Sequence, residues 1–276
     1  MAAQERELTP ERSVRDLFGF QLRDLRKRNG LSLAELSKLV AYSKTHLGNV
    51  ETAIRAIPPD LPRKLDELLT TDGIFNRLYP LVLREAFPDR SRRFMELEAL
   101  AASMRKYAAG AFPGLWQTPD YGHAAIRLGR PRAEQDEIEQ VWAARAARQR
   151  RLTDESPPLV RVVLDESVIR RPVGSPAVMR RQLDHVLTLA EGPHNIVQVL
   201  PFSAGGHGAM GGSITLLDFL DAPRVAYAEG SVSGHLLESP DAVLESALTY
   251  DLVQAAALSP DESTAWLRRA REDFRR

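Results

Sequence analysis

The hydrophobic and polar positions of residues 31–51 repeat one pattern twice in a short stretch. Ser32 precedes a run with helical apolar spacing, and Glu35 follows it by three residues, as in a capped helix start with a capping box. Ser43 opens a second such run about eleven residues later. Two caps this close cannot belong to one long helix. The pattern therefore predicts a helix, a tight turn centred near Ala41, and a second helix.

The apolar residues predict which side of each helix is buried. Leu36 lies on the apolar stripe of the first helix, and Leu47 and Val50 lie on the stripe of the second. Leu31 with Leu36, and Tyr42 with Leu47, occupy the two positions of a hydrophobic staple around each cap. The residues that we expect to have structural roles in this motif are Ser32, Glu35, Leu36, Leu47, Val50 and Glu51.

The second helix has polar side chains at its start and on its opposite face. A major groove admits one helix, whose first residues reach base edges while hydroxyls, amides and basic groups hold phosphates. A generic helix pair with a solvated face is the alternative, but the double cap and the turn length favour DNA binding. We expect Glu51 to position the following loop so that Arg55 meets the DNA backbone. The predicted DNA-binding residues are Ser43, Lys44, Thr45, His46, Asn49 and Arg55.

The segment from Tyr42 to Arg55 resembles the lambda-repressor/Cro-like (XRE) helix-turn-helix family. It matches the pattern YSKxHLxxVExxxR carried by actinobacterial regulators of that family. The chain departs from the family at Leu33, where Gln is usual, and at Gly48, where Ser is common. It also departs at two positions where the family usually has Gly, and these are Ala41 and Ala53. The resemblance implies a sequence-specific transcriptional regulator that binds double-stranded DNA.

The charge of the predicted DNA-binding region indicates how many copies of the chain bind one DNA site. The whole chain has a formal net charge of zero. Between Phe18 and Ile57, lysines and arginines outnumber acids only modestly. Each neutralised phosphate adds about one unit of salt dependence, so a single copy would bind weakly. We therefore expect a homodimer that reads two half-sites of a palindromic operator.

The rest of the chain divides into further segments. Residues 1–13 are expected to be a flexible tail, 14–78 an all-α helix-turn-helix bundle, and 79–93 a connector. Residues 94–276 are expected to form an α+β domain with a small mixed sheet. Apolar spacing predicts helices at 94–110, 132–152, 177–191, 240–257 and 260–274. Short β-branched runs bounded by Gly, Pro or Asp predict strands at 159–166, 195–202, 213–219 and 224–230.

This second half carries a resemblance of its own. The segments FMELEALAASMRKY, PGLWQTPDY, ESVIRRPVG and QVLPFSAGGHGAMGGSITLLDF resemble a C-terminal domain that accompanies this helix-turn-helix in actinobacteria. That domain is of unknown function and is called antitoxin-like; Trp116 stands where it usually has Leu. The resemblance implies a domain for dimerisation, effector sensing or binding of a small partner protein. The alternative is an antitoxin-like binding protein that uses DNA binding for autoregulation.

Catalytic and cofactor chemistry has little support in the sequence. Residues 206–211 match the letters of a dinucleotide-binding loop, but a predicted strand follows them where that loop needs a helix. A hydrolase triad could be drawn from a serine with His235 and Asp241, yet no nucleophile-elbow GxSxG is present. No histidine has a metal-ligand spacing. We expect no catalytic residues, no metal and no cofactor, and hence no enzyme.

Two aromatic residues leave a choice open. Trp116 and Tyr121 could line a cleft for a ligand or partner, or they could fill the space between helix and sheet. The sequence has no Cys, a polar start and no apolar run long enough for a membrane span. These features predict a soluble cytoplasmic protein.

Overall fold

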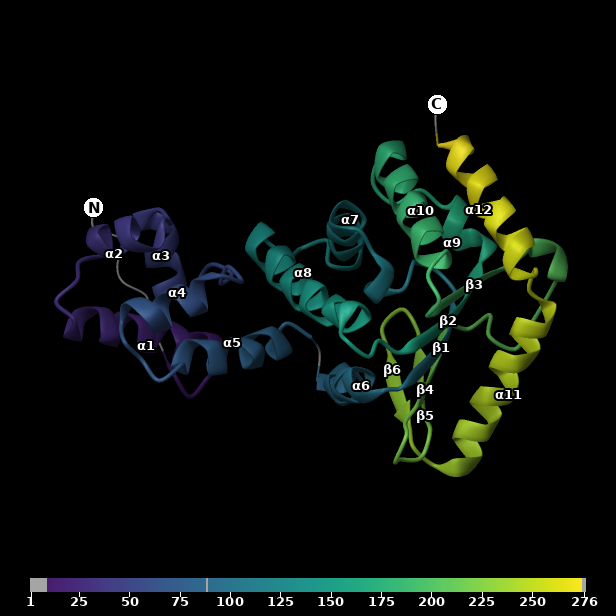
Figure 1. Ribbon diagram of the computed structural model, residues 1–276, viewed down its shortest axis with the longest axis horizontal. Helices are drawn as coiled ribbons and strands as arrows, with labels where there is room; N and C mark the ends of the chain where they lie inside the picture. The colour runs from purple at the N-terminus through teal and green to yellow at the C-terminus, as the bar shows by residue number, and fades with distance from the viewer. Residues whose placement is uncertain (1–8, 88, 275–276) are drawn as a thin grey trace. The chain divides into compact units, whose positions relative to one another are not determined.

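The computed structural model describes residues 9–87 and 89–274 and divides into two compact units (Figure 1). The first unit comprises Met1–Pro88 with Arg130–Ala144, and the second comprises Asp89–Gly129 with Arg145–Arg276. Residues 1–8 of the expected tail lie outside the described residues.

The first unit is a helical bundle. Its helices up to Pro88 are α1 (Val14–Arg28), α2 (Leu33–Val40), α3 (Lys44–Glu51), α4 (Leu61–Leu68) and α5 (Ile74–Glu85). Serine side chains cap the first three: Ser13, Ser32 and Ser43 each accept a hydrogen bond from a backbone N–H in the first turn. The core of the bundle consists of Phe18, Leu22, Leu36, Val40, Leu47, Val50, Ile57, Leu61, Leu65, Leu69, Phe75 and Val82.

The segment at residues 79–93, which we expected to be a connector, is mostly helical. Its first residues belong to α5, and its last belong to α6 (Asp89–Leu100). Glu85 near the end of α5 accepts a hydrogen bond from the backbone N–H of Val14 at 2.7 Å, which ties α5 to the start of α1. The bundle therefore extends beyond residue 78.

The second unit is an α+β domain around a six-stranded mixed sheet, which confirms the expected fold class. Its strand order is β3-β2-β1-β4-β5-β6; β3, β2 and β1 are parallel, and the others pair antiparallel. The strands are β1 (Ser103–Ala108), β2 (Leu159–Asp165), β3 (Asn195–Leu200), β4 (Ser213–Asp218), β5 (Val225–Glu229) and β6 (Gly234–Leu237). Its remaining helices are α7 (Pro119–Gly129), the last turns of α8 (Gln135–Gln149), α9 (Glu166–Arg170), α10 (Pro176–Ala190), α11 (Pro240–Ala256) and α12 (Pro260–Asp273).

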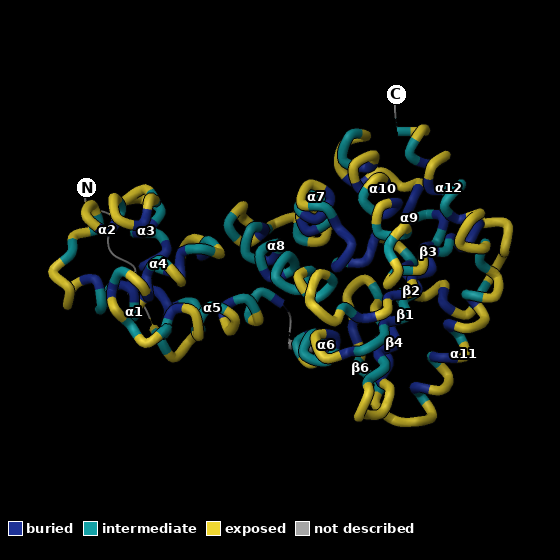
Figure 2. The backbone as a smooth tube through the Cα atoms, viewed as in Figure 1, coloured by how far each residue is buried: buried dark blue, intermediate teal, exposed yellow. Residues whose placement is uncertain are grey.

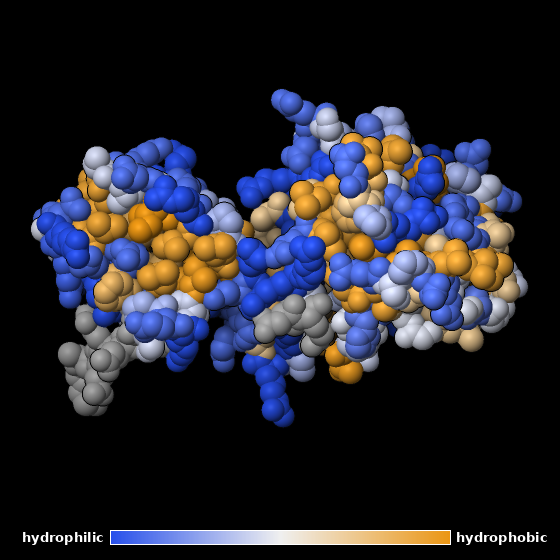
Figure 3. Space-filling view, turned by 90° about the horizontal axis from the view of Figure 1, so that it is seen from below, coloured by the Kyte–Doolittle hydropathy of each residue, from blue (hydrophilic) through white to orange (hydrophobic). Residues whose placement is uncertain are grey.

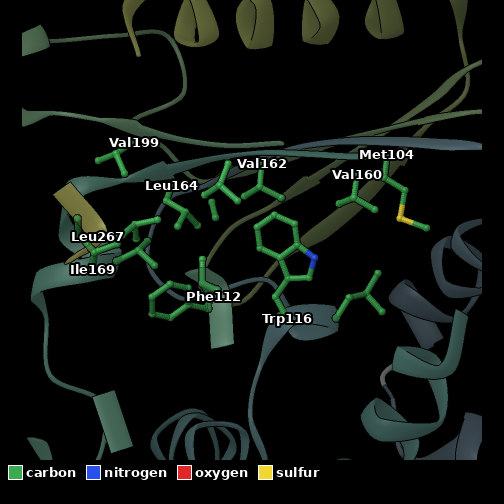
Figure 4. Close-up of a cluster of buried hydrophobic side chains, with 14 of the residues drawn as sticks. Met104, Phe112, Trp116, Val160, Val162, Leu164, Ile169, Val199 and Leu267 are labelled. Carbon is green, nitrogen blue, oxygen red and sulfur yellow. The ribbon is translucent and has the colours of Figure 1, made fainter. Parts of the chain in front are cut away.

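Each face of the sheet has its own core, because successive side chains of a strand point to opposite faces. Val162 and Leu164 pack with residues of α10 and α12, whereas Val163 between them packs with residues of α11. Figure 4 shows the first core, with the Trp116 indole directed toward Val160 and Val162 of the sheet. The two α-helical layers thus enclose the sheet.

The four expected strands are present as β2 to β5, and the glycine-rich segment is a loop between β3 and β4, as expected. The expected helix at 94–110 is wrong beyond Leu100, because β1 begins at Ser103. This strand pairs with β2 on one side and β4 on the other, and this pairing outweighs the helical pattern of the local sequence. The sequence did not predict the short β6.

Candidate nucleic-acid interface

The predicted helix, turn and helix are present as α2, Ala41 and α3. Ser32 and Glu35 form the complete capping box: the Ser32 N–H donates to Glu35 Oε2 at 2.8 Å, and the Glu35 N–H donates to Ser32 Oγ at 3.2 Å. Ala41 ends α2 in the left-handed conformation, with φ of 60°. Ser43 then caps α3 by accepting from the His46 N–H at 3.1 Å.

The inner side of α3 packs closely on the bundle. Leu47 has no exposed surface, and Val50 is almost completely buried. Gly19 of α1 lies so near that a Cβ atom there would be 2.8 Å from the carbonyl oxygen of Glu51 and 2.9 Å from that of Val50. A side chain at position 19 would push the two helices apart, so this glycine sets the depth at which α3 sits.

Glu51 is held from α1. The Arg26 side chain donates to Glu51 from Nε at 2.5 Å and from a terminal nitrogen at 3.0 Å. Both side chains are buried, with Glu51 only 3% exposed. The structural role of Glu51 is thus an ion pair that joins α3 to α1. We expected Glu51 to position the loop before Arg55; the structure shows its carboxylate bound to Arg26 of α1.

The outer side of α3 presents polar groups. Ser43, Lys44 and Thr45 are exposed at its first turn, and Asn49 is half-buried one turn later. The first backbone N–H groups of a helix carry no internal partner, and the helix dipole adds positive potential there. Together with the Lys44 ammonium, this end of α3 can hold a phosphate and reach a base edge.

His46 has a different environment from its neighbours. Its ring stacks on Tyr42 with centroids 5.4 Å apart, and its Nε2 is buried without a hydrogen-bond partner in the described part of the chain. Burial of the imidazole, and then the charge of Arg55, lowers the pKa of His46, with Asp136 acting in the opposite direction. The ring is therefore neutral near pH 7 and adds no charge to the interface.

Tyr42 in turn fixes the start of α3. Its hydroxyl donates to Asp60, and burial with this carboxylate raises the pKa of Tyr42 to about 12. Lys64 lies over the Tyr42 ring, with Nζ 5.0 Å from the centroid, and its ammonium is 2.8 Å from Asp60. This network anchors the turn before α3 to α4.

Arg55 lies in the loop that follows α3. The carbonyl oxygen of Asn49 accepts hydrogen bonds from the N–H groups of Ile54 at 2.8 Å and Arg55 at 3.1 Å, and these hold the loop. Arg55 is exposed, and its Nε lies 3.5 Å from Oδ2 of Asp136. Sequence reasoning missed Asp136, which lies in the acidic first turn of α8. Asp136 is thus paired with Arg55, one of the side chains that we predicted to bind the DNA backbone.

The two aromatic residues of the second unit lie in its core. Trp116 and Tyr121 have no exposed surface and pack within the cluster on the α10 side of the sheet. They fill the space between helix and sheet, as the second of our two alternatives supposed.

Comparison with known proteins finds a matching domain family for each part of the chain. A helix-turn-helix domain matches residues 17–74, a range that contains every predicted DNA-binding residue. A domain of unknown function (DUF5753) matches residues 91–269. The chain belongs to the DUF5753 family. No curated protein and no solved structure matches it.

The family match leaves the task of the second unit open, whereas the helix-turn-helix match assigns DNA binding to the first. No helix in the described ranges combines the length and the apolar character that crossing a bilayer requires. The protein is thus a DUF5753 family member whose DNA-binding domain carries an exposed polar helix start.

Proposed function

We propose that this DUF5753 family member is a sequence-specific transcriptional regulator of the XRE type, and that α3 is its recognition helix. The observation that carries the proposal is the first turn of α3, where Ser43, Lys44 and Thr45 are exposed while the opposite side of the helix is buried. A major groove accommodates a helix presented in this way.

Each side chain has a distinct role in this proposal. Ser43 and the first amides of α3 hold a phosphate, while Lys44, Thr45 and Asn49 face base edges. Arg55 holds the backbone beside the groove once a phosphate displaces Asp136. His46 supports Tyr42 and the helix start, because its ring is neutral and partly covered.

The experiment is nuclease footprinting of the full chain with the double variant Lys44→Ala, Asn49→Ala. Both side chains lie outside the core, so we expect unchanged folding and loss of sequence preference. Arg63→Ala is the matched control: this side chain is 61% exposed on α4, outside the proposed interface. A footprint that persists in the double variant, at the sequence that wild type protects, would refute the assignment.

The proposal extends to the whole chain. The protein acts in the cytoplasm, where two copies read two inverted half-sites. A single copy would bind DNA weakly, because its surplus positive charge is modest. The second unit holds the copies together, senses an effector or binds a small partner protein, and it performs no catalysis. The exposed leucines of α11 support a role in contact with another chain.

A further inference from the structure

Helix α11 is hydrophobic on two sides. On the inner side, Val243, Ala247 and Tyr250 pack against the sheet. On the outer side, Leu244 is 70% exposed, Leu248 is 58% exposed and Leu252 is 64% exposed. Figure 2 shows the alternation of buried and exposed positions along this helix. A helix that is apolar on both sides is usually covered on both.

The three outer leucines, which we call the leucine stripe, form one line. They are spaced by four residues, so each lies one turn above the last on the same face. The exposed Ala255 and Asp241 lie near the same line at the two ends of the helix. The stripe therefore has the spacing of a helix-pairing surface.

Other exposed apolar residues lack this regularity. Figure 3 shows hydrophobic residues on the surface of the first unit, where Phe20 of α1 is 43% exposed and Leu81 of α5 is 41% exposed. Leu220 is 88% exposed but stands alone in the turn between β4 and β5. Only the leucine stripe, within the part of the chain that the structure describes, repeats over two turns of one helix at such exposure.

We propose that the leucine stripe pairs with the leucine stripe of a second copy, with the two α11 helices antiparallel and crossing at Leu248. This inference rests on the proposed dimeric function and names the surface that joins the copies. A two-fold axis at Leu248 brings Leu244 level with Leu252 of the second copy. It also brings Asp241 level with Ala255 of the second copy, which is a small apolar residue.

Charge selects the antiparallel arrangement. Helix α11 carries acids at 241, 245 and 251 and no Lys or Arg. A parallel pair would set Asp241, which lies near the line of the stripe, level with Asp241 of the second copy. In the antiparallel pair, Glu245 is level with Asp251 of the second copy, but they lie at opposite edges of the stripe, since 100° per residue places them about 60° to either side of Leu248. Arg105 also lies 3.3 Å from Asp251 and neutralises it.

The surface predicts a weak dimer. A helix of this length is roughly 25 Å long and about 10 Å wide. The surface that one face of it can bury is therefore smaller than the roughly 800 Å² per partner of standard interfaces. We therefore expect a dimer that dissociates on dilution and is reinforced when both copies bind one DNA duplex.

The first test is analytical ultracentrifugation of the full chain over a wide concentration range. We expect a concentration-dependent dimer for wild type and a monomer for Leu248→Glu. Leu220→Glu, which adds the same charge at a leucine that is even more exposed, is expected to dimerise as wild type does. Circular dichroism verifies that each variant is folded. A wild type that stays monomeric throughout, or a Leu248→Glu variant that dimerises as wild type, overturns the proposal; loss of the dimer in Leu81→Glu alone would move the interface to the first unit.

The second test uses the absence of cysteine from the chain. A disulfide needs Cα atoms within about 7 Å, a separation that facing positions on a two-fold axis between packed helices satisfy. Leu248→Cys should thus form a disulfide-linked dimer under mild oxidation, whereas Leu220→Cys should not. Equal cross-linking of the two variants would contradict the crossing at Leu248.

The two proposals can fail separately. Leu248→Glu leaves residues 43–55 intact, so its affinity for a duplex with one half-site should equal that of wild type. It should lose only the gain in affinity that a second half-site gives. If wild type dimerises through Leu248 but retains no duplex, the proposed function fails and the surface stands. If duplex binding is normal but Leu248→Glu still dimerises, the surface fails alone.

Discussion

At the scale of single residues, Ala41 and Ala53 adopt left-handed backbone conformations, with φ of 60° and 55°. Glycine is usual at both positions in the family that the first unit resembles. An L-residue with a Cβ atom is strained there by roughly 1–2 kcal/mol. Each alanine therefore lowers the stability of the motif that it terminates.

We predict that Ala41→Gly raises the free energy of unfolding by about 0.5–1 kcal/mol, because Ala41 is exposed and its methyl group contributes little packing. Urea denaturation of both proteins measures the difference. Ala34→Gly, in the first turn of α2 and also exposed, is the control and should lower stability, because Ala34 already has helical backbone. Destabilisation by both substitutions would show that the strain at Ala41 is negligible.

The lowered pKa of His46 predicts that the stability of the protein depends on pH. Its pKa is lowered in the folded protein, so the unfolded chain binds the proton more readily. The stability that neutral His46 provides is complete above the unfolded pKa of about 6.5 and is lost as pH falls below it. We predict that His46→Gln gains stability relative to wild type between about pH 7.5 and pH 5.5. Urea unfolding across this range measures it, and parallel curves for the two proteins would contradict it.

At the scale of elements, the buried Arg26–Glu51 pair fixes α3 to α1. Removing one partner leaves the other charge buried, which costs roughly 3–5 kcal/mol. We predict that Glu51→Ala unfolds the first unit and abolishes DNA binding, although Glu51 does not face DNA. Thermal unfolding and duplex titration measure both effects. Glu67→Ala removes an acid from a pair that is 61% and 62% exposed, and should cost less than about 1 kcal/mol.

The contact between Arg55 and Asp136 predicts a gain in affinity. Asp136→Asn frees Arg55 for a phosphate, and partly exposed pairs are worth roughly 0.2–1 kcal/mol. We therefore expect DNA affinity at low salt to rise by about 1.5- to 5-fold. Glu134→Gln removes the same charge from the same segment without touching Arg55, so it should change affinity less. Equal effects of the two variants would show that only long-range charge matters.

What could be predicted at this scale depends on sequence distance. The caps at Ser32 and Ser43 form hydrogen bonds within three residues, so the local sequence contains all of the information. The partner of Glu51 lies 25 residues away, and no local pattern indicates it. The prediction of β1 failed for the same reason, because the strands that pair with it, β2 and β4, come much later in the chain. The acid beside Arg55 likewise comes from a distant segment.

At the scale of the whole molecule, the sequence predicted both fold classes, because hydrophobic periodicity separates helices from strands over long segments. The leucine stripe escaped notice, since leucines at helical spacing are as consistent with a core. Only the structure shows which of the apolar faces of α11 is covered.

The proposed dimer, joined through the second unit, leads to a prediction about the DNA site that it binds. The operator should contain two inverted half-sites with centres about 34 Å, or roughly ten base pairs, apart, or a multiple of that spacing. Footprinting of the wild-type protein on its bound fragments measures this spacing. Direct repeats, or a single unrepeated half-site under a dimer, would contradict the two-fold arrangement.

The central claim is that the exposed start of α3 reads duplex DNA. Its most direct test is selection of bound duplexes from a random-sequence pool by the full chain at low salt, in parallel with the Lys44→Ala, Asn49→Ala variant. The account predicts one enriched motif for wild type and none for the variant. It is contradicted if wild type retains no duplex, or if both proteins enrich the same motif.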